Sequence, residues 1–140
     1  MNISSLSDTA AAYLAGLIDG EGTITLCRKD KNENRQLAVT ISNTELKILE
    51  YAKQNIGAGK ITRKRTSSSN HTPSYTYAIY NRQALLVLKQ IYPYLQSYKA
   101  TRAKLIIENY IRLTPRNGKY SQTLKSSREQ FETSLLSIKP

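Results

Sequence analysis

The chain has 140 residues, which fits a single domain whose core needs no disulfide bonds. One cysteine and one histidine exclude a disulfide framework, a cysteine-based zinc site and a metal site built on two histidines of the chain. Lys and Arg number 21 against 10 Asp and Glu, so the formal net charge is +11 and a polyanionic partner is favoured.

The positive charge is unevenly distributed along the chain. Residues 1–27 carry three acidic and no basic side chains, whereas residues 28–66 carry ten basic and four acidic ones. Such basic surface attracts nucleic-acid phosphates, with a merely solubilising surface as the alternative. Binding to a membrane surface is disfavoured because the basic residues fall mostly in strand-like segments. The longest apolar run, residues 10–15, is far shorter than the roughly 20 residues of a membrane span. We expect an intracellular protein without a membrane partner.

The first predicted helix covers residues 9–18 and is capped by Ser7 or Asp8. It ends at the Asp-Gly-Glu-Gly segment that follows, where glycines allow a tight exit. Apolar and polar side chains then alternate, which predicts half-buried strands over residues 23–29 and 36–42.

The second half of the chain continues this pattern. Asn43 or Thr44 is expected to cap a second helix that ends at Ile56, and Asn81 to cap a third that Pro93 stops. We expect strands over residues 60–65 and 74–80, a loop over 66–73, and helices over 82–92, 97–113 and, more weakly, 121–137. The order predicts an α+β fold with an α-β-β-α-β-β-α core. A four-stranded antiparallel sheet would carry helices on one face, with further helices at the C-terminus.

One face of this sheet is expected to be polar, cationic and free of Asp and Glu. Such a mixture of donors and acceptors suits the reading of base edges in the major groove of DNA. The candidate contacts on the strands are Thr25, Cys27, Lys29, Gln36, Ala38, Thr40, Ser42, Lys60, Thr62, Lys64 and Thr76, and Lys31 lies in the first strand connection. Which of Tyr75, Tyr77 and Tyr80 share this face stays open.

The segment Leu-Ala-Gly-Leu-Ile-Asp-Gly-Glu-Gly at residues 14–22 is the most specific feature of the sequence. Gly16 and Gly20 lie four residues apart, so two copies of the helix could approach closely. Asp19 and Glu21 follow the helix, whose last carbonyls carry partial negative charge. Two such ends side by side would form a site for a hard cation such as Mg²⁺, which requires a homodimer. The expected interface consists of Tyr13, Ala15, Gly16, Asp19 and Gly20.

This segment resembles the motif that names the LAGLIDADG homing endonucleases. Residues 39–46, 56–61 and 92–103 also resemble segments of that family, so the likeness covers about residues 8–113. We expect one domain, residues 1–140, with residues 114–140 as a helical tail. Only one copy of the motif is present, so the chain is similar to the homodimeric branch.

The resemblance implies a role for each matching residue. Glu21 would be the essential metal ligand, assisted by the Gly20 carbonyl. Asn43 would order water, at a position where relatives often carry the longer Gln. Lys99 would lie beside the scissile phosphate, and Lys47 would be a second basic residue. Asp19 matches the first acidic position and is expected to be structural, closing the helix end.

The implied activity is Mg²⁺-dependent hydrolysis of double-stranded DNA by a homodimer that shares two or more ions. The target would be long and near-palindromic, and cleavage would leave 3′ overhangs and promote the mobility of an intron or intein. The location would be the cytoplasm, or a mitochondrion or chloroplast for an organelle-encoded protein. Alternatives are an RNA-binding intron maturase and a DNA-binding regulator that does not cleave.

Overall fold

The helices and strands follow one another in the predicted order. The computed structural model describes residues 2–28, 30–64 and 72–140. The elements are α1 (Asp8–Glu21), β1 (Gly22–Cys27), β2 (Gln36–Asn43), α2 (Leu46–Ile56), β3 (Lys60–Lys64), β4 (Ser74–Tyr80), α3 (Asn81–Ile91), the short 3-10 helix η1 (Tyr92–Tyr94), α4 (Tyr98–Asn109) and α5 (Gln122–Ser137). The predicted α+β fold is confirmed. Among the described residues, no helix is long and apolar enough to span a membrane.

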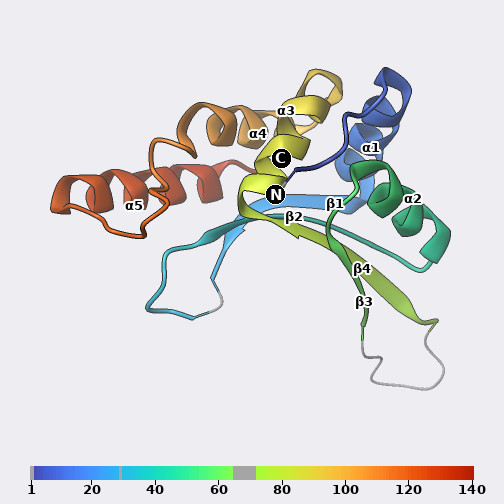
Figure 1. Cartoon of the computed structure of the whole chain (residues 1–140), viewed down its shortest axis with the longest axis horizontal. Coiled ribbons are helices and arrows are strands. Elements are labelled where there is room, and N and C mark those ends of the chain that lie inside the picture. The colour runs from blue at the N-terminus through green and yellow to red at the C-terminus, as the bar shows by residue number, and fades with distance from the viewer. Residues whose placement is uncertain (1, 29, 65–71) are drawn as a thin grey trace.

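The four strands form one antiparallel sheet in the order β1-β2-β4-β3. The helices lie on one side of this sheet and leave its other face uncovered (Figure 1). The covered face carries the apolar set of each strand, because successive side chains of a strand point to opposite faces. Leu37, Val39 and Ile41 of β2 are each at most 1% exposed. The alternation seen in the sequence therefore decides which face of the sheet carries the helices.

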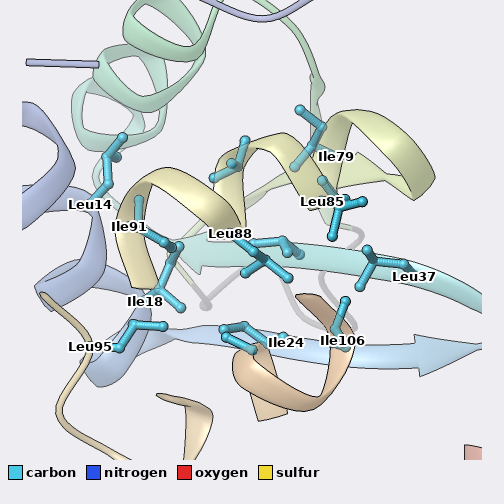
Figure 2. Close-up of a cluster of buried hydrophobic side chains, with 14 of the residues drawn as sticks. Leu14, Ile18, Ile24, Leu37, Ile79, Leu85, Leu88, Ile91, Leu95 and Ile106 are labelled. Atoms are coloured by element: carbon cyan, nitrogen blue, oxygen red, sulfur yellow. The ribbon is translucent and has the colours of Figure 1, made fainter. Parts of the chain in front are cut away.

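The core lies between the sheet and helices α1, α3 and α4. Figure 2 shows Leu14 and Ile18 of α1, Leu88 of α3, Ile24 of β1 and Ile106 of α4 in one buried cluster. All five side chains are at most 1% exposed. Fully burying such side chains contributes about 1.5–3 kcal/mol each. The core thus fixes the end of α1 against the end of the sheet, where the candidate site lies.

Helix α1 is longer than the sequence predicted. It runs through Glu21 instead of ending at Ile18, so the Asp-Gly-Glu segment forms its last turn. The helix stops at Gly22, whose N–H donates to the Ile18 carbonyl. A Cβ atom at Gly22 would lie 2.8 Å from Cα of Ile18, so this position has no room for a side chain. Glycine permits a turn without requiring one, and here Gly20 stays helical.

Three other predicted helix ends were wrong. The cap of α2 is Glu45, and the Asn43 side chain instead accepts a hydrogen bond from the Glu45 N–H at 2.8 Å. Asn81 is the first residue of α3, with φ of 55°, and its side chain accepts from the Tyr110 hydroxyl at 3.2 Å. Helix α4 ends at Asn109 rather than at residue 113. Local hydrogen-bonding side chains mark the neighbourhood of a helix end more reliably than its first residue.

Candidate functional site

The last turn of α1 is held by the ammonium group of Lys99, from the first turn of α4. The Nζ atom donates to the carbonyls of Ile18 at 2.8 Å and Asp19 at 2.9 Å. Lys99 is 8% exposed, and burial lowers its pKa although the Asp19 charge acts in the opposite direction. A cation at this end of a helix stabilises the unpaired carbonyls. Lys99 therefore caps α1 within the protomer.

The carboxylate of Asp19 binds the start of α4. It accepts hydrogen bonds from the backbone N–H of Gln96 at 2.8 Å and of Ser97 at 3.1 Å, and from the Ser97 hydroxyl. Burial raises its pKa, but these hydrogen bonds and the Lys99 charge outweigh that effect, so the net pKa is lowered. Asp19 and Lys99 thus form a reciprocal contact that joins the end of α1 to the beginning of α4.

Glu21 is the exposed acidic residue of the motif, at the last position of α1. The pairing of Gly22 with Ile41 places Glu21 at the end of the sheet where β2 reaches Asn43. Asn43 is half-buried and engaged with Glu45, while Lys47 is exposed in the first turn of α2. The structure therefore gathers Glu21, Asn43 and Lys99 at one end of the fold, and Lys47 follows on the next helix.

The donors at this end fit a hard divalent cation, but one protomer supplies few of them. Glu21 offers a carboxylate, and Gly20 is exposed with its carbonyl in the final helical turn. Oxygen ligands of this kind suit Mg²⁺. Within residues 2–28, 30–64 and 72–140, no three His, Cys, Asp or Glu side chains lie together in a way that could hold an ion. An ion at Glu21 would need further ligands from outside the protomer.

The exposed face of α1 differs from the expected interface at Ala15, and the Asp19 carboxylate is bound to the start of α4. Tyr13 is 48% exposed, and a Cβ atom at Gly16 or Gly20 would meet nothing within 4 Å. Ala15 instead points into the core and is fully buried. The Tyr13 ring packs edge-to-face on Tyr51 of α2, with 4.9 Å between centroids. A smooth surface along Gly16 and Gly20, bordered by Tyr13, is open to another molecule.

The uncovered face of the sheet contains the predicted polar residues, which the strand register sets in rows. One row joins Thr40 to Ala78 and Lys60, and another joins Ser42 to Thr76 and Thr62. The Ser42 and Thr76 hydroxyls lie 2.8 Å apart. The face also carries Thr25, Cys27, Gln36, Ala38 and Lys64. This hydroxyl, amide and ammonium surface is able to hydrogen-bond to the edges of bases.

Three of the predicted DNA contacts, Ala38, Lys31 and Lys29, are not exposed side chains on the described strands. Ala38 is 2% exposed, so its neighbours cover it although it belongs to this face. Lys31 is exposed in the connection between β1 and β2, where its carbonyl accepts from the Arg28 guanidinium at 3.4 Å. Lys29 lies outside the described residues.

The sequence interpretation left open which tyrosines of β4 share the polar face, and the structure shows that Tyr80 does. Its backbone pairs with that of Ala38, and the side chain is 43% exposed. Tyr75 and Tyr77 point to the opposite face, where Tyr77 is buried and donates to the Ala58 carbonyl at 2.6 Å. The two-residue period counted from Thr76 identifies Tyr80, because Thr76, Ala78 and Tyr80 must share a face.

Comparison with known proteins agrees with this architecture. The homing endonuclease I-CvuI bound to its target superposes with a TM-score of 0.75 at 18% identity, over 94% of this chain and 83% of that one. The intron-encoded homing endonuclease I-CeuI, complexed with DNA, gives 0.57 at 16% identity, over 90% and 77%. For I-GzeII with its DNA target the TM-score is 0.67 at 17% identity, over 96% of this chain and 45% of that one.

At the level of sequence, a search of curated proteins finds no match. The family model of the LAGLIDADG endonuclease matches residues 14–113, which include the motif, the whole sheet and most of the helical layer. The chain belongs to the LAGLIDADG endonuclease family.

Proposed function

We propose that the chain is a homodimeric, divalent-metal-dependent endonuclease that cuts both strands of a long, near-palindromic DNA site and leaves 3′ overhangs. The observation that carries this proposal is the exposed carboxylate of Glu21, at the end of a helix whose outer face is open at Gly16 and Gly20. Two such helices, side by side, would bring two Glu21 carboxylates together. A role in the mobility of a host intron or intein follows from the family.

The homodimer is supported by size as well as by the open helix face. The chain corresponds to 45% of the length of I-GzeII, so that relative has room for two such units. One protomer of this protein supplies a single Glu21, and its described residues contain no complete metal site. A second copy would provide the missing ligands.

Binding of DNA is supported by the uncovered sheet face and by charge. That face carries Lys60 and Lys64 among hydroxyl and amide side chains, and the chain has a net charge of +11. I-CvuI has been crystallised with DNA in the presence of calcium or magnesium. Strands of this composition fit the major groove.

In the proposed reaction, Glu21 and the Gly20 carbonyl of each protomer would hold Mg²⁺, which activates water and stabilises the leaving oxygen when bound. Asn43 would position water through its side-chain amide. Lys99 and Asp19 would keep the helix end in place, since the Lys99 ammonium is already engaged with two α1 carbonyls. Lys47 would lie near the phosphate backbone. We place the protein inside the cell, in the cytoplasm or an organelle.

The decisive experiment compares wild type with Glu21→Gln on DNA recovered by the wild-type protein from a randomised duplex library. Glu21→Gln should bind that DNA with unchanged affinity and lose cleavage in Mg²⁺ by at least 100-fold. Glu50→Gln, an exposed carboxylate on α2, is the matched control and should cleave normally. Cleavage by Glu21→Gln at the wild-type rate would refute the metal assignment. Selection of structured RNA in place of duplex DNA would favour the maturase alternative.

A further inference from the structure

We infer that α5 is a positioning element for DNA recognition, in which Arg128 and Glu132 fix the beginning of β2 on the polar sheet face. This inference rests on the proposed function and adds residues that lie outside the sheet and outside the α1 site. Helix α5 packs beside β1, on the side of the fold where β1 and β2 are joined (Figure 1).

Two arginine side chains bind the outer side of β1, which is an edge strand of the sheet. Its carbonyls at Ile24 and Leu26 accept hydrogen bonds from guanidinium groups in place of a fifth strand. Arg102 of α4 donates to Ile24 at 2.9 Å, and Arg35 donates to Leu26 at 3.5 Å. Arg102 also donates to the Ile138 carbonyl, just after α5, at 3.0 Å. The C-terminal segment is thereby joined to β1.

A second set of contacts holds the chain where it enters β2. Arg128 is 2% exposed, and its guanidinium donates to the Arg35 carbonyl at 2.6 Å. Glu132 accepts from the Arg35 backbone N–H at 3.3 Å and from Arg128 Nε at 3.0 Å. Both backbone groups of Arg35 therefore bind side chains of α5.

The remaining contacts of Arg128 make this pair rigid. The guanidinium also donates to the Leu113 carbonyl at 3.0 Å and to the Thr114 hydroxyl, and it lies 5.6 Å from the centroid of the Tyr110 ring. The pair is thus anchored to the segment that follows α4 as well as to α5. A buried guanidinium with this many partners occupies one orientation, so the carbonyl of Arg35 has one as well.

The residue placed by this arrangement belongs to the DNA-reading face. Gln36 follows Arg35 directly, opens β2 and pairs with Cys27 on the polar face. Because base discrimination by a side-chain amide depends on its position, a shift of Arg35 would displace Gln36 and weaken its discrimination. We therefore expect loss of the α5 contacts to affect the bases that Gln36 reads and to spare those read from β3.

The experiment measures base preference at each position by selection from randomised duplex DNA, using the full-length protein. The Gln36→Ala and Lys60→Ala variants first identify the positions read from β2 and from β3. Arg128→Gln is then compared with Leu135→Ala, which truncates a fully buried side chain of the same helix that is apolar and cannot hydrogen-bond to Arg35. Both are assayed at a temperature where more than nine-tenths of each is folded. Glu132→Ala, which removes the acceptor of the Arg35 backbone N–H, serves if Arg128→Gln does not fold.

Arg128→Gln or Glu132→Ala should lower base preference at least threefold at the Gln36 positions and leave the Lys60 positions within twofold. Leu135→Ala should leave both sets unchanged. An even loss over all positions, or the same profile for Leu135→Ala, would show that α5 contributes stability alone and overturn the inference. A wild-type protein that selects no sequence would overturn the proposed function together with it. Selection by wild type with an unchanged Arg128→Gln profile would overturn the inference alone.

Discussion

The ammonium group of Lys99 lies 2.9 Å from the carbonyl oxygen of Asp19, and it closes the C-terminal turn of the helix that carries the family motif. The resemblance to known endonucleases implied that this lysine lies beside the scissile phosphate. In the free protomer it has a structural partner. Because Lys99 holds the end of α1, it also determines the position of Glu21, which follows Asp19 by two residues.

Replacement of Lys99 by methionine should therefore destabilise the protein in the absence of DNA. We expect a loss of about 1–3 kcal/mol in the free energy of unfolding, because two helix-end carbonyls lose a charged donor. Urea denaturation of the metal-free, DNA-free protein provides the measurement. Lys104→Met, at an exposed position of the same helix, should change stability by no more than about 0.5 kcal/mol. Equal stability of the two variants would contradict the capping role.

A bulky side chain on the outer face of α1 should separate the protomers without unfolding them. A Cβ atom at Gly16 would meet nothing within 4 Å, so the helix can carry a side chain there, and arginine is a better helix former than glycine. Sedimentation should show a monomer with intact secondary structure. Gly22→Ala provides the contrast, because its Cβ atom would lie 2.8 Å from Ile18 Cα and should cost about 1–3 kcal/mol of stability. A dimeric Gly16→Arg protein would place the interface elsewhere.

Lys64 should contribute to discrimination between DNA sequences. It lies on the polar face opposite Ser74, and a lysine directed at guanine is worth about 1–3 kcal/mol of preference. Lys64→Ala should change half-site preference in binding competitions at fixed salt. Lys125→Ala, exposed on α5, should leave preference unchanged. If Lys64→Ala instead weakens binding to every sequence equally and reduces the salt slope by about 1, then Lys64 contacts a phosphate.

Buried tyrosines should make the protein sensitive to alkali. Burial raises the pKa of Tyr77 above its ordinary value of 10.0, so the unfolded chain ionises first and stability falls as the pH rises above about 10. Below that pH the full contribution is present. Tyr77→Phe should flatten this decline in a series of thermal or urea unfolding experiments. The hydrogen bond to Ala58 would be lost, at a cost of about 0.5–1.5 kcal/mol at neutral pH.

Tyr110 provides the internal check on that experiment. Its pKa is also raised by burial, although the charges of Arg128 and Arg82 act in the opposite direction. The double variant with Phe at positions 77 and 110 should be flatter above pH 10 than either single variant. A decline in the double variant as steep as that of wild type would assign the alkaline sensitivity to other groups.

The arrangement of the sheet was predictable because period-two alternation is a local signal. Leu37, Val39 and Ile41 predicted the buried face of β2, and the polar residues between them predicted the face that the helices leave uncovered. The same rule would have placed Tyr80 had it been applied along the whole of β4. Alternation predicts the face of the sheet on which a side chain lies, but not how exposed that side chain is. Ala38 therefore belongs to the polar face and is nevertheless buried by its neighbours.

The interactions around the α1 end were not predictable in the same way. Lys99 is 80 residues from Asp19 in the chain, and their contact depends on how α4 packs on the sheet. Ala15 is a small residue like the neighbouring Gly16 but lies about 100° around the helix, which places it in the core. The Arg128–Glu132 pair had no sequence signal beyond a spacing of four residues, common on exposed helices.

The guanidinium groups bound to the carbonyls on the outer side of β1 affect the tendency of the protein to aggregate. A protein with an open sheet risks pairing its terminal strands with those of other molecules. Arg102 and Arg35 occupy the groups through which β1 would recruit a foreign strand. At the opposite border, β3 exposes Lys60, Arg63 and Lys64, whose like charges repel a second copy. Aggregation through the sheet is thus discouraged at both borders.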